Sequence, residues 1–334
     1  SDAEIIEMLA QHLITKPVFD ALFDEYSFAA HNPMALAMQK VLDVLNQHQL
    51  DSETEALQRF YDSVKLRASG IDSAEGKQKI IVELYDKFFR NAFPRMTERL
   101  GIVYTPVEVV DFILHSVNDI LKQEFGKSIA DEGVHVLDPF TGTGTFITRL
   151  LQSGLIPPNK LSYKYKNEIH ANEIVLLAYY IASINIETVY HDQMKMVNPD
   201  LEYSPFEGIC LTDTFQMYEK EDLVDQVLVD NSARRKRQKS LDIQVIIGNP
   251  PYSGISSNNG EWISKLIEDY KYINGIHFNE RKHWLNDDYV KFIRFAQEVV
   301  NKESNAIIAY VTPHSFTDNL TFRGMRWNLM HSFD

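Results

Sequence analysis

The stretch Ile243-Gln244-Val245-Ile246-Ile247-Gly248-Asn249-Pro250-Pro251-Tyr252 decides the fold. Its apolar start is typical of a buried strand, which must end at the two prolines because they lack backbone donors and hold φ fixed. A residue before proline avoids the helical region, so Asn249 stays extended. Open α/β sheets bind ligands at the carboxyl edge of their strands. We therefore expect the Asn249 amide to lie in a cleft; the plainer alternative is a loop that only terminates a strand.

A second stretch, VHVLDPFTGTGTF at residues 134–146, predicts a strand, a tight glycine turn and a helix. Gly142 and Gly144 would let the backbone approach a ligand closely, and Asp138 would place a carboxylate at the strand tip. The turn is not a P-loop, because no Gly-Lys-Ser/Thr follows, and it lacks the third glycine of the dinucleotide fingerprint. The acidic strand tip followed by two glycines indicates a small-ligand site of another kind.

Further strands at residues 169–172, 208–211 and 306–312 alternate with helical patterns, which predicts an α/β fold with a mostly parallel sheet. Glu173 follows the second strand, where such folds bind ribose hydroxyls, and Asp213 follows the third. Thr105 is predicted to cap a helix over 107–121, with Pro106 in its first position. Residues 253–286 predict a looser active-site loop, and helices are predicted over 287–301 and 319–330.

The first part of the chain, residues 1–99, has helical spacing of apolar residues and no catalytic constellation. Asn32-Pro33 is predicted to start one helix, Ser52 to cap another, and a further helix is predicted over 77–93. We expect residues 1–99 to be a helical spacer or docking region and residues 100–334 to be a catalytic domain.

The composition is that of an ordinary globular protein, with 334 residues, 44% hydrophobic and 24% charged. No apolar run approaches the ~20 residues of a membrane span, and no N-terminal signal segment is visible. The single cysteine, Cys210, excludes an internal disulfide and fits a reducing cytoplasm, where we expect the protein. The chain starts at Ser1 rather than methionine, as expected of a piece of a longer protein. No metal-ligand pattern is evident.

The net charge of −14 argues against a surface wholly devoted to nucleic acid, but it leaves room for a local basic groove. The densest cationic run is Arg234-Arg235-Lys236-Arg237. We interpret this run as a solvated loop, with DNA contact as the alternative.

Taken together, residues 101–327 resemble the S-adenosylmethionine-dependent amino-methyltransferases that act on adenine in DNA, which have a Rossmann-like class I fold. The resemblance rests on an ordered set of motifs: Tyr104-Thr105-Pro106, Asp138-Pro139-Phe140-Thr141-Gly142-Thr143-Gly144, Glu173, Asp213 and Asn249-Pro250-Pro251-Tyr252. This order looks like the gamma arrangement, in which the cofactor half comes first. The helical leader and the spacers are similar to the methylase part of type ISP restriction-modification enzymes, large polypeptides with nuclease, helicase, methylase and recognition parts.

The resemblance implies S-adenosylmethionine as cofactor and duplex DNA with a flipped adenine as partner, with no membrane. It places Thr105 and Pro106 near the methionine end, Glu173 at the ribose and Asp213 by the adenine of the cofactor. The full implied cofactor set is Tyr104, Thr105, Pro106, Asp138, Phe140, Thr141, Gly142, Gly144, Thr145, Glu173, Asp213 and Thr214. Phe140 departs from the family pattern, since many relatives have a small residue there.

The implied catalytic residues are Asn249, Pro250, Pro251 and Tyr252. The exocyclic amine of adenine is a poor nucleophile, because its lone pair is delocalised into the ring. Two acceptors, the Asn249 side-chain oxygen and the Pro250 carbonyl, would favour the tetrahedral nitrogen of the transition state. Tyr252 would stack on the extruded base, which is worth roughly 1–3 kcal/mol.

Other activities are weighed on the same residues. Cytosine C5 methylation needs a cysteine nucleophile, and Cys210 lies inside an apolar strand, so we reject it. Cytosine N4 methylation commonly has Ser in place of Asn249. Methylation of protein glutamine or RNA guanine uses a similar Asn-Pro-Pro-Tyr turn and stays open, as does a non-catalytic DNA-docking module. The incomplete glycine fingerprint disfavours an NAD dehydrogenase.

Overall fold

The computed structural model describes residues 2–22, 31–46, 62, 66, 105–218, 228–252, 256, 258–279, 283–300 and 305–333. Its centre is a parallel sheet with strand order β3-β2-β1-β4-β7. The strands are β1 (His135–Asp138), β2 (Ile169–Glu173), β3 (Ile209–Leu211), β4 (Ile243–Gly248) and β7 (Ile307–Tyr310). The predicted Rossmann-like α/β fold is confirmed. Because every pairing is parallel, the carboxyl ends of the strands meet at one edge of the sheet.

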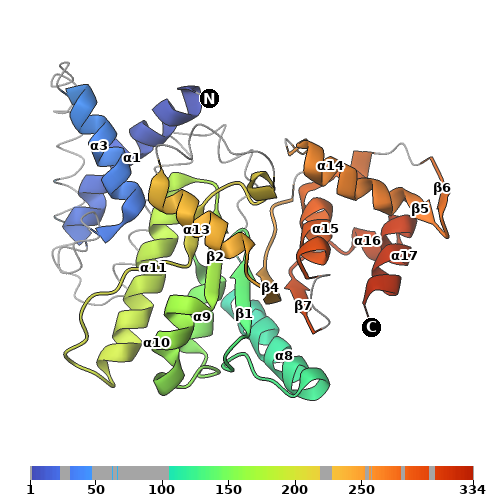
Figure 1. The fold of residues 1–334 in the computed structure, drawn as a ribbon, viewed down its shortest axis with the longest axis horizontal. Coiled ribbons are helices and arrows are strands. Elements are labelled where there is room, and N and C mark those ends of the chain that lie inside the picture. The colour runs from blue at the N-terminus through green and yellow to red at the C-terminus, as the bar shows by residue number, and fades with distance from the viewer. Residues whose placement is uncertain are drawn as a thin grey trace.

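Helices cover both faces of this sheet (Figure 1). On one face, Val136 and Val245 pack against α8 (Val107–Phe125), α9 (Thr145–Gln152) and α11 (Leu176–Lys195). On the other, Leu137 and Ile246 pack against α14 (Glu261–Ile267) and α15 (Asp288–Val300). Apolar residues therefore point to both sides of β1 and β4, as expected of a parallel sheet buried on both faces.

Two N-terminal helices, α1 (Asp2–Leu22) and α3 (Pro33–Asn46), lie beside α11 and α13 in Figure 1. His12 Nδ1 lies 2.9 Å from the Tyr180 hydroxyl of α11, which joins α1 to the sheet-bearing part. Asn32 caps α3 as predicted, since its Oδ1 accepts the Met34 and Ala35 N–H groups. The predicted helix over 77–93 and the predicted cap at Ser52 lie outside the described residues.

The basic run is not a loop, contrary to the prediction. It lies in α13 (Val229–Lys239), which packs along β3. Arg234 Nη1 donates to the carbonyls of Phe206 and Ile209, and Arg237 Nη2 donates to that of Glu207. These arginines satisfy carbonyls at the start of β3, a long-range role that a local cationic pattern does not reveal.

The described part of residues 253–286 is more ordered than predicted. Besides α14, their described part contains η4 (Glu268–Lys271), a hairpin of β5 (Tyr272–Ile273) and β6 (Ile276–His277), and η5 (His283–Asn286). Asn274 (φ 51°) and Gly275 (φ 76°) make the two-residue hairpin turn, a signal that was present in the sequence. The helix predicted over 319–330 is instead η6 (Leu320–Phe322) followed by α17 (Arg323–Ser332), with α16 (Ser315–Asp318) before them.

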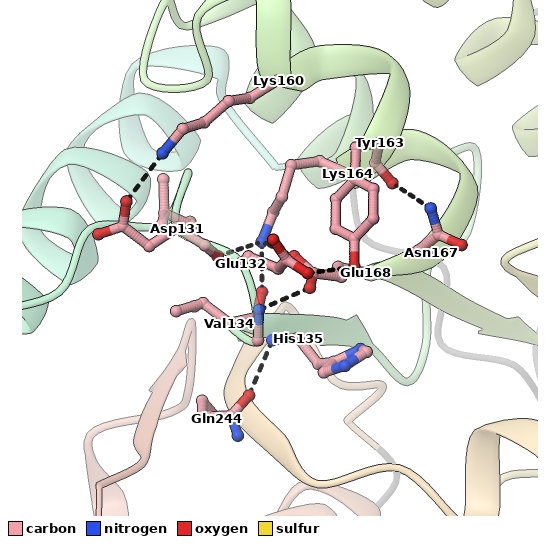
Figure 2. A network of polar contacts seen from close by, with 12 residues as sticks. Asp131, Glu132, Val134, His135, Lys160, Tyr163, Lys164, Asn167, Glu168 and Gln244 are labelled. Atoms are coloured by element: carbon pink, nitrogen blue, oxygen red, sulfur yellow. Dashed lines mark hydrogen bonds and ion pairs between the residues drawn. The ribbon is translucent and has the colours of Figure 1, made fainter.

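The opposite edge of the sheet holds a buried ion pair on α10 (Pro158–Asn167) (Figure 2). Lys164 Nζ lies 2.7 Å from Glu168 Oε2 and donates to the Val134 carbonyl at 2.5 Å. Glu168 Oε1 accepts the Gly133 N–H at 2.6 Å. The pair therefore ties α10 to the turn that enters β1, on the side away from the carboxyl ends. None of the helices in the described ranges is long and apolar enough to cross a membrane.

Candidate active site

The tips of β1 and β4 touch at Gly248. Its φ is 147°, a conformation that side chains rarely adopt, and a Cβ there would stand 2.2 Å from the Phe140 ring and 2.8 Å from Asp138 Oδ1. Glycine therefore lets the two strand ends approach, and Asn249 follows directly on the chain. The Asp138 motif and the Asn249 motif therefore meet at the same edge of the sheet.

Asp138 is 1% exposed at the end of β1. Its Oδ1 accepts the Phe140 N–H at 3.2 Å, whereas its Oδ2 is buried with no hydrogen-bond partner among the described residues. Burial raises the pKa of this carboxyl to about 7, and the Phe140 N–H and the Thr141 hydroxyl act in the opposite direction. A buried carboxylate oxygen without a partner is a place where a cationic or N–H-bearing ligand group fits.

The conformation of the glycine turn depends on two glycines and on a backbone hydrogen bond to β2. Gly142 (φ 56°) and Gly144 (φ 87°) are both left-handed, and a Cβ on Gly144 would lie 3.3 Å from the Ala182 Cα of α11. The Thr141 N–H donates to the Asn172 carbonyl at 2.9 Å, so the turn is fastened to β2. The turn leads into α9, which starts at Thr145.

Glu173 at the end of β2 is 8% exposed and binds backbone groups with both carboxyl oxygens. Oε1 accepts the Ile174 and Val175 N–H groups at 2.9 and 2.8 Å, and Oε2 accepts the Gly142 N–H at 2.9 Å. Burial raises the pKa of Glu173 to about 7, against the lowering effect of these three donors. Glu173 thus fixes the position of the glycine turn.

The residues after β3 reach the same edge. Asp213 is half-buried, and its Oδ1 accepts the Phe215 N–H at 2.9 Å. Thr214 is buried, and its hydroxyl donates to the Pro139 carbonyl at 2.6 Å. Thr214 therefore joins the β3 segment to the turn after β1.

The Asn249 amide is held at both ends. Its Nδ2 donates to Thr105 Oγ1 at 2.9 Å, and the Tyr252 hydroxyl lies 2.5 Å from its Oδ1. Thr105 does not cap α8, contrary to the prediction: Pro106 is the N-cap residue and α8 starts at Val107. The physical reason is that the Thr105 hydroxyl is engaged by Asn249.

Tyr252 is half-buried, and its ring lies edge-on to Tyr289 at 6.3 Å between centroids. Its hydroxyl also lies 2.9 Å from the Val311 carbonyl, and burial raises its pKa. The Tyr252 hydroxyl therefore already bonds to Asn249 Oδ1, the oxygen predicted from the sequence to accept an N–H group of the substrate amine. Pro250 is buried and Pro251 is half-buried.

Bonds join Thr105 to Asn249, Asn249 to Tyr252, Glu173 to Gly142 and Thr214 to the Pro139 carbonyl, while Tyr104 lies outside the described residues. Sequence reasoning missed two aromatic residues that hold Phe140: the rings of Phe292 and Tyr310 lie edge-on to it at 4.8 and 5.0 Å. The position of Tyr310 at the end of a strand, shortly before Pro313, was the only feature of the sequence that could have indicated this contact. Within the described ranges, His, Cys, Asp and Glu form no group of three or more that could hold a metal.

Comparisons with known proteins give consistent results. The Eco57I restriction-modification methylase family matches residues 159–333, and the type ISP restriction-modification enzyme coupler domain matches residues 1–76. No match was found among curated proteins.

Three solved structures share the fold over most of this chain. The ATP-dependent type ISP restriction-modification enzyme LlaBIII bound to DNA is 46% identical with a TM-score of 0.85, over 96% of this chain and 22% of LlaBIII. A nuclease-deletion mutant of the type ISP enzyme LlaGI with a DNA substrate mimic is 45% identical (TM-score 0.86; 98% and 27%). The DrdV–DNA complex is 35% identical (TM-score 0.86; 100% and 32%). The chain spans 22% to 32% of the length of these proteins.

Proposed function

The chain belongs to the Eco57I restriction-modification methylase family, and from this premise we propose that it transfers a methyl group from S-adenosylmethionine to the N6 amine of adenine in DNA. The similarity to LlaBIII, LlaGI and DrdV, each solved with DNA or a DNA mimic, supports DNA as the substrate. The coupler match supports a larger polypeptide that also carries nuclease, helicase and target-recognition parts. Within it, residues 1–99 are the docking region and residues 100–334 are the methylase domain.

One observation carries the proposal: Gly248, the last residue of β4, lies directly against Asp138 and Phe140, so Asn249 follows at the strand end where the Asp138 carboxylate lies. Gly248 makes this contact possible, since any larger residue would collide with Asp138 and Phe140. A base amine against Asn249 and a methyl donor over the glycine turn would then be neighbours.

The described residues fit S-adenosylmethionine. The unpartnered Asp138 Oδ2 suits a cation, and the left-handed Gly142, where a Cβ would meet nothing within 4 Å, leaves open space beside the backbone. The residues that would hold the cofactor are Tyr104, Thr105, Pro106, Asp138, Phe140, Thr141, Gly142, Gly144, Thr145, Glu173, Asp213 and Thr214. When bound, the cofactor supplies an electrophilic methyl group on a sulfonium.

The Asn249 Oδ1 and the Pro250 carbonyl accept the two N–H groups of the target amine. These contacts strengthen as the nitrogen becomes tetrahedral, so they stabilise the transition state more than the bound base. On transfer, the nitrogen would form a bond to the methyl carbon as the carbon–sulfur bond of the sulfonium breaks, which leaves a neutral thioether. The methylated nitrogen would then release one proton to water, for which no protein base is required because the alkylated cation is strongly acidic. Tyr252 leaves Asn249 and stacks on the extruded base.

The test uses the full polypeptide that carries this chain, tritiated S-adenosylmethionine and unmethylated plasmid DNA. Nucleoside analysis of the product is expected to show N6-methyladenine. Asn249→Ala is expected to lower the rate by about 100-fold or more, as for loss of one oxyanion-hole donor, while calorimetry shows unchanged binding of S-adenosylhomocysteine.

The matched control is Asn167→Ala, which removes an exposed amide of α10 bonded to the Tyr163 carbonyl. It should leave the rate unchanged. N4-methylcytosine in the product would show that cytosine, and not adenine, is the substrate. Label in RNA or in a glutamine-containing peptide instead of DNA would show that the substrate is not DNA. Full activity in Asn249→Ala would remove the mechanism.

A further inference from the structure

The side chains of Thr105 and Asn249 meet from opposite parts of the chain, 144 positions apart. Asn249 Nδ2 donates to Thr105 Oγ1 at 2.9 Å, and Thr105 is only 7% exposed. At its other end, the amide oxygen faces the Tyr252 hydroxyl at 2.5 Å. The amide therefore lies between two hydroxyl groups.

The orientation of this amide decides whether it can assist an amine. An asparagine side chain presents an acceptor at one end and two N–H donors at the other, and a half turn exchanges them. With the NH₂ end toward the target, two donors would face the N–H groups of the amine. Only the orientation with NH₂ toward Thr105 leaves Oδ1 as an acceptor. This is the orientation in the structure, where Nδ2 faces Thr105 Oγ1 and Oδ1 faces the Tyr252 hydroxyl.

Thr105 is rigidly mounted. Pro106 follows it as the N-cap residue, with φ −56° and ψ 137°, and the Pro106 carbonyl accepts the Val109 and Val110 N–H groups. The helix start has no side-chain cap, although threonine is a common capping residue. The Thr105 hydroxyl therefore does not cap α8 and instead bonds to Asn249.

We propose that Thr105 is a positioning residue for methyl transfer, whose hydroxyl oxygen holds Asn249 Nδ2 and keeps Oδ1 turned toward the target amine. This inference rests on the proposed function. It gives Thr105 a task beyond cofactor binding. When Tyr252 swings away to stack on the base, Thr105 is the contact that still fixes the amide.

The experiment compares Thr105→Val, which keeps the shape and removes the hydroxyl, with Thr105→Ser, which restores it, in the full polypeptide. Thr105→Val is expected to lower kcat at saturating S-adenosylmethionine by about 10- to 100-fold, the usual effect of losing an orienting partner. Because Thr105 is also among the residues that would hold the cofactor, the Kd of S-adenosylhomocysteine is measured by calorimetry in parallel. The loss in kcat should persist at saturating cofactor, and Thr105→Ser should recover most of kcat.

Two further variants separate positioning from general damage. Thr15→Val removes another buried hydroxyl, which donates to the Gln11 carbonyl in α1, and should leave kcat unchanged. In an Asn249→Ala background, Thr105→Val should have no further effect, since the group that it positions is gone. Thr105→Ala serves in the same comparison if the valine variant does not fold.

The outcomes are distinct. An unchanged kcat in Thr105→Val, a loss confined to the KM and Kd of the cofactor, or an equal loss in the Asn249→Ala background would each overturn the inference. A wild-type polypeptide that binds S-adenosylhomocysteine but methylates no DNA would overturn the proposed function, and the inference with it.

Discussion

Glu173 Oε2 accepts the backbone N–H of Gly142 at 2.9 Å, so the acidic end of β2 directly holds the glycine turn after β1. The same carboxylate accepts two more N–H groups, from Ile174 and Val175. A residue predicted to bind ribose therefore also has a structural task in the protein itself.

Glu173→Gln is expected to destabilise the fold, because the NH₂ group of glutamine would face at least one of these N–H donors. A buried donor left without an acceptor costs about 1–3 kcal/mol. Urea unfolding at pH 7 measures the difference. Glu132→Gln is the control, since Glu132 is exposed and accepts only the Tyr163 hydroxyl among the bonds that the structure describes; its effect should stay within about 0.5 kcal/mol. Equal effects of the two substitutions would refute the structural task of Glu173.

The pKa of about 7 at Asp138 predicts a pH dependence of stability. Between about pH 4 and pH 7 the native carboxyl keeps a proton that the unfolded chain has lost, so the native state binds more protons. The contribution of Asp138 to the free energy of unfolding therefore falls as the pH rises through this window, by up to about 1.4 kcal/mol per pH unit, and levels off above it. Asp138→Asn removes this contribution, so its stability relative to wild type should increase from pH 5 to pH 8. Parallel pH profiles of the two proteins would contradict the assignment.

A cationic cofactor predicts a second pH effect at the same residue. S-Adenosylmethionine should favour the charged form of Asp138, so its affinity is expected to rise from pH 6 to pH 8, whereas neutral S-adenosylhomocysteine should respond less. Calorimetry at three pH values tests this. The dependence should disappear in Asp138→Asn; if it persists there, another group is responsible.

Tyr252→Phe separates the hydroxyl of this residue from its ring. The ring can still stack on a base, but nothing then covers Asn249 Oδ1 or the Val311 carbonyl, so we expect DNA binding to be equal or tighter. Tyr252→Ala should weaken binding by about 1–3 kcal/mol through lost stacking. Fluorescence titration with 2-aminopurine at the target position measures both. If the phenylalanine and alanine variants behave alike, stacking is not the function of the ring.

The buried pair of Figure 2 predicts a contrast between two lysines of α10. Lys164→Met leaves Glu168 buried without its cation, which typically costs about 3–5 kcal/mol. Lys160→Met breaks the half-exposed pair with Asp131, which should cost less than about 1 kcal/mol. Urea unfolding of both variants tests the difference. Similar midpoints would mean that water replaces the Lys164 ammonium.

The sequence was sufficient for the elements that follow local rules. The apolar run before Asn249 became β4 over its full predicted length, and Asp138 and Glu173 end their strands as expected. The Asn274-Gly275 turn also follows a local rule, although it was not predicted. The prediction was wrong where a long-range contact overrides the local pattern. Thr105 was predicted to cap a helix but binds Asn249. Arg234 was predicted to lie in a solvated loop but donates to carbonyls at the start of β3.

The contacts within the site were less predictable than its members. Nothing local in the sequence indicates that Tyr252 folds back onto Asn249, or that Thr214 donates to the Pro139 carbonyl. These bonds depend on how three strand ends meet in space. Motif order therefore identified the residues, but only the packed sheet showed which of them bind one another.

Adjacent turns of helix α11 contact α1 and the glycine turn. Tyr180 meets His12 of α1, and Ala182 and Ile186 are the residues against which Gly144 is packed. One helix therefore links α1 to the turn that we propose holds the methyl donor, so a substitution at the His12–Tyr180 contact can alter that turn from a distance.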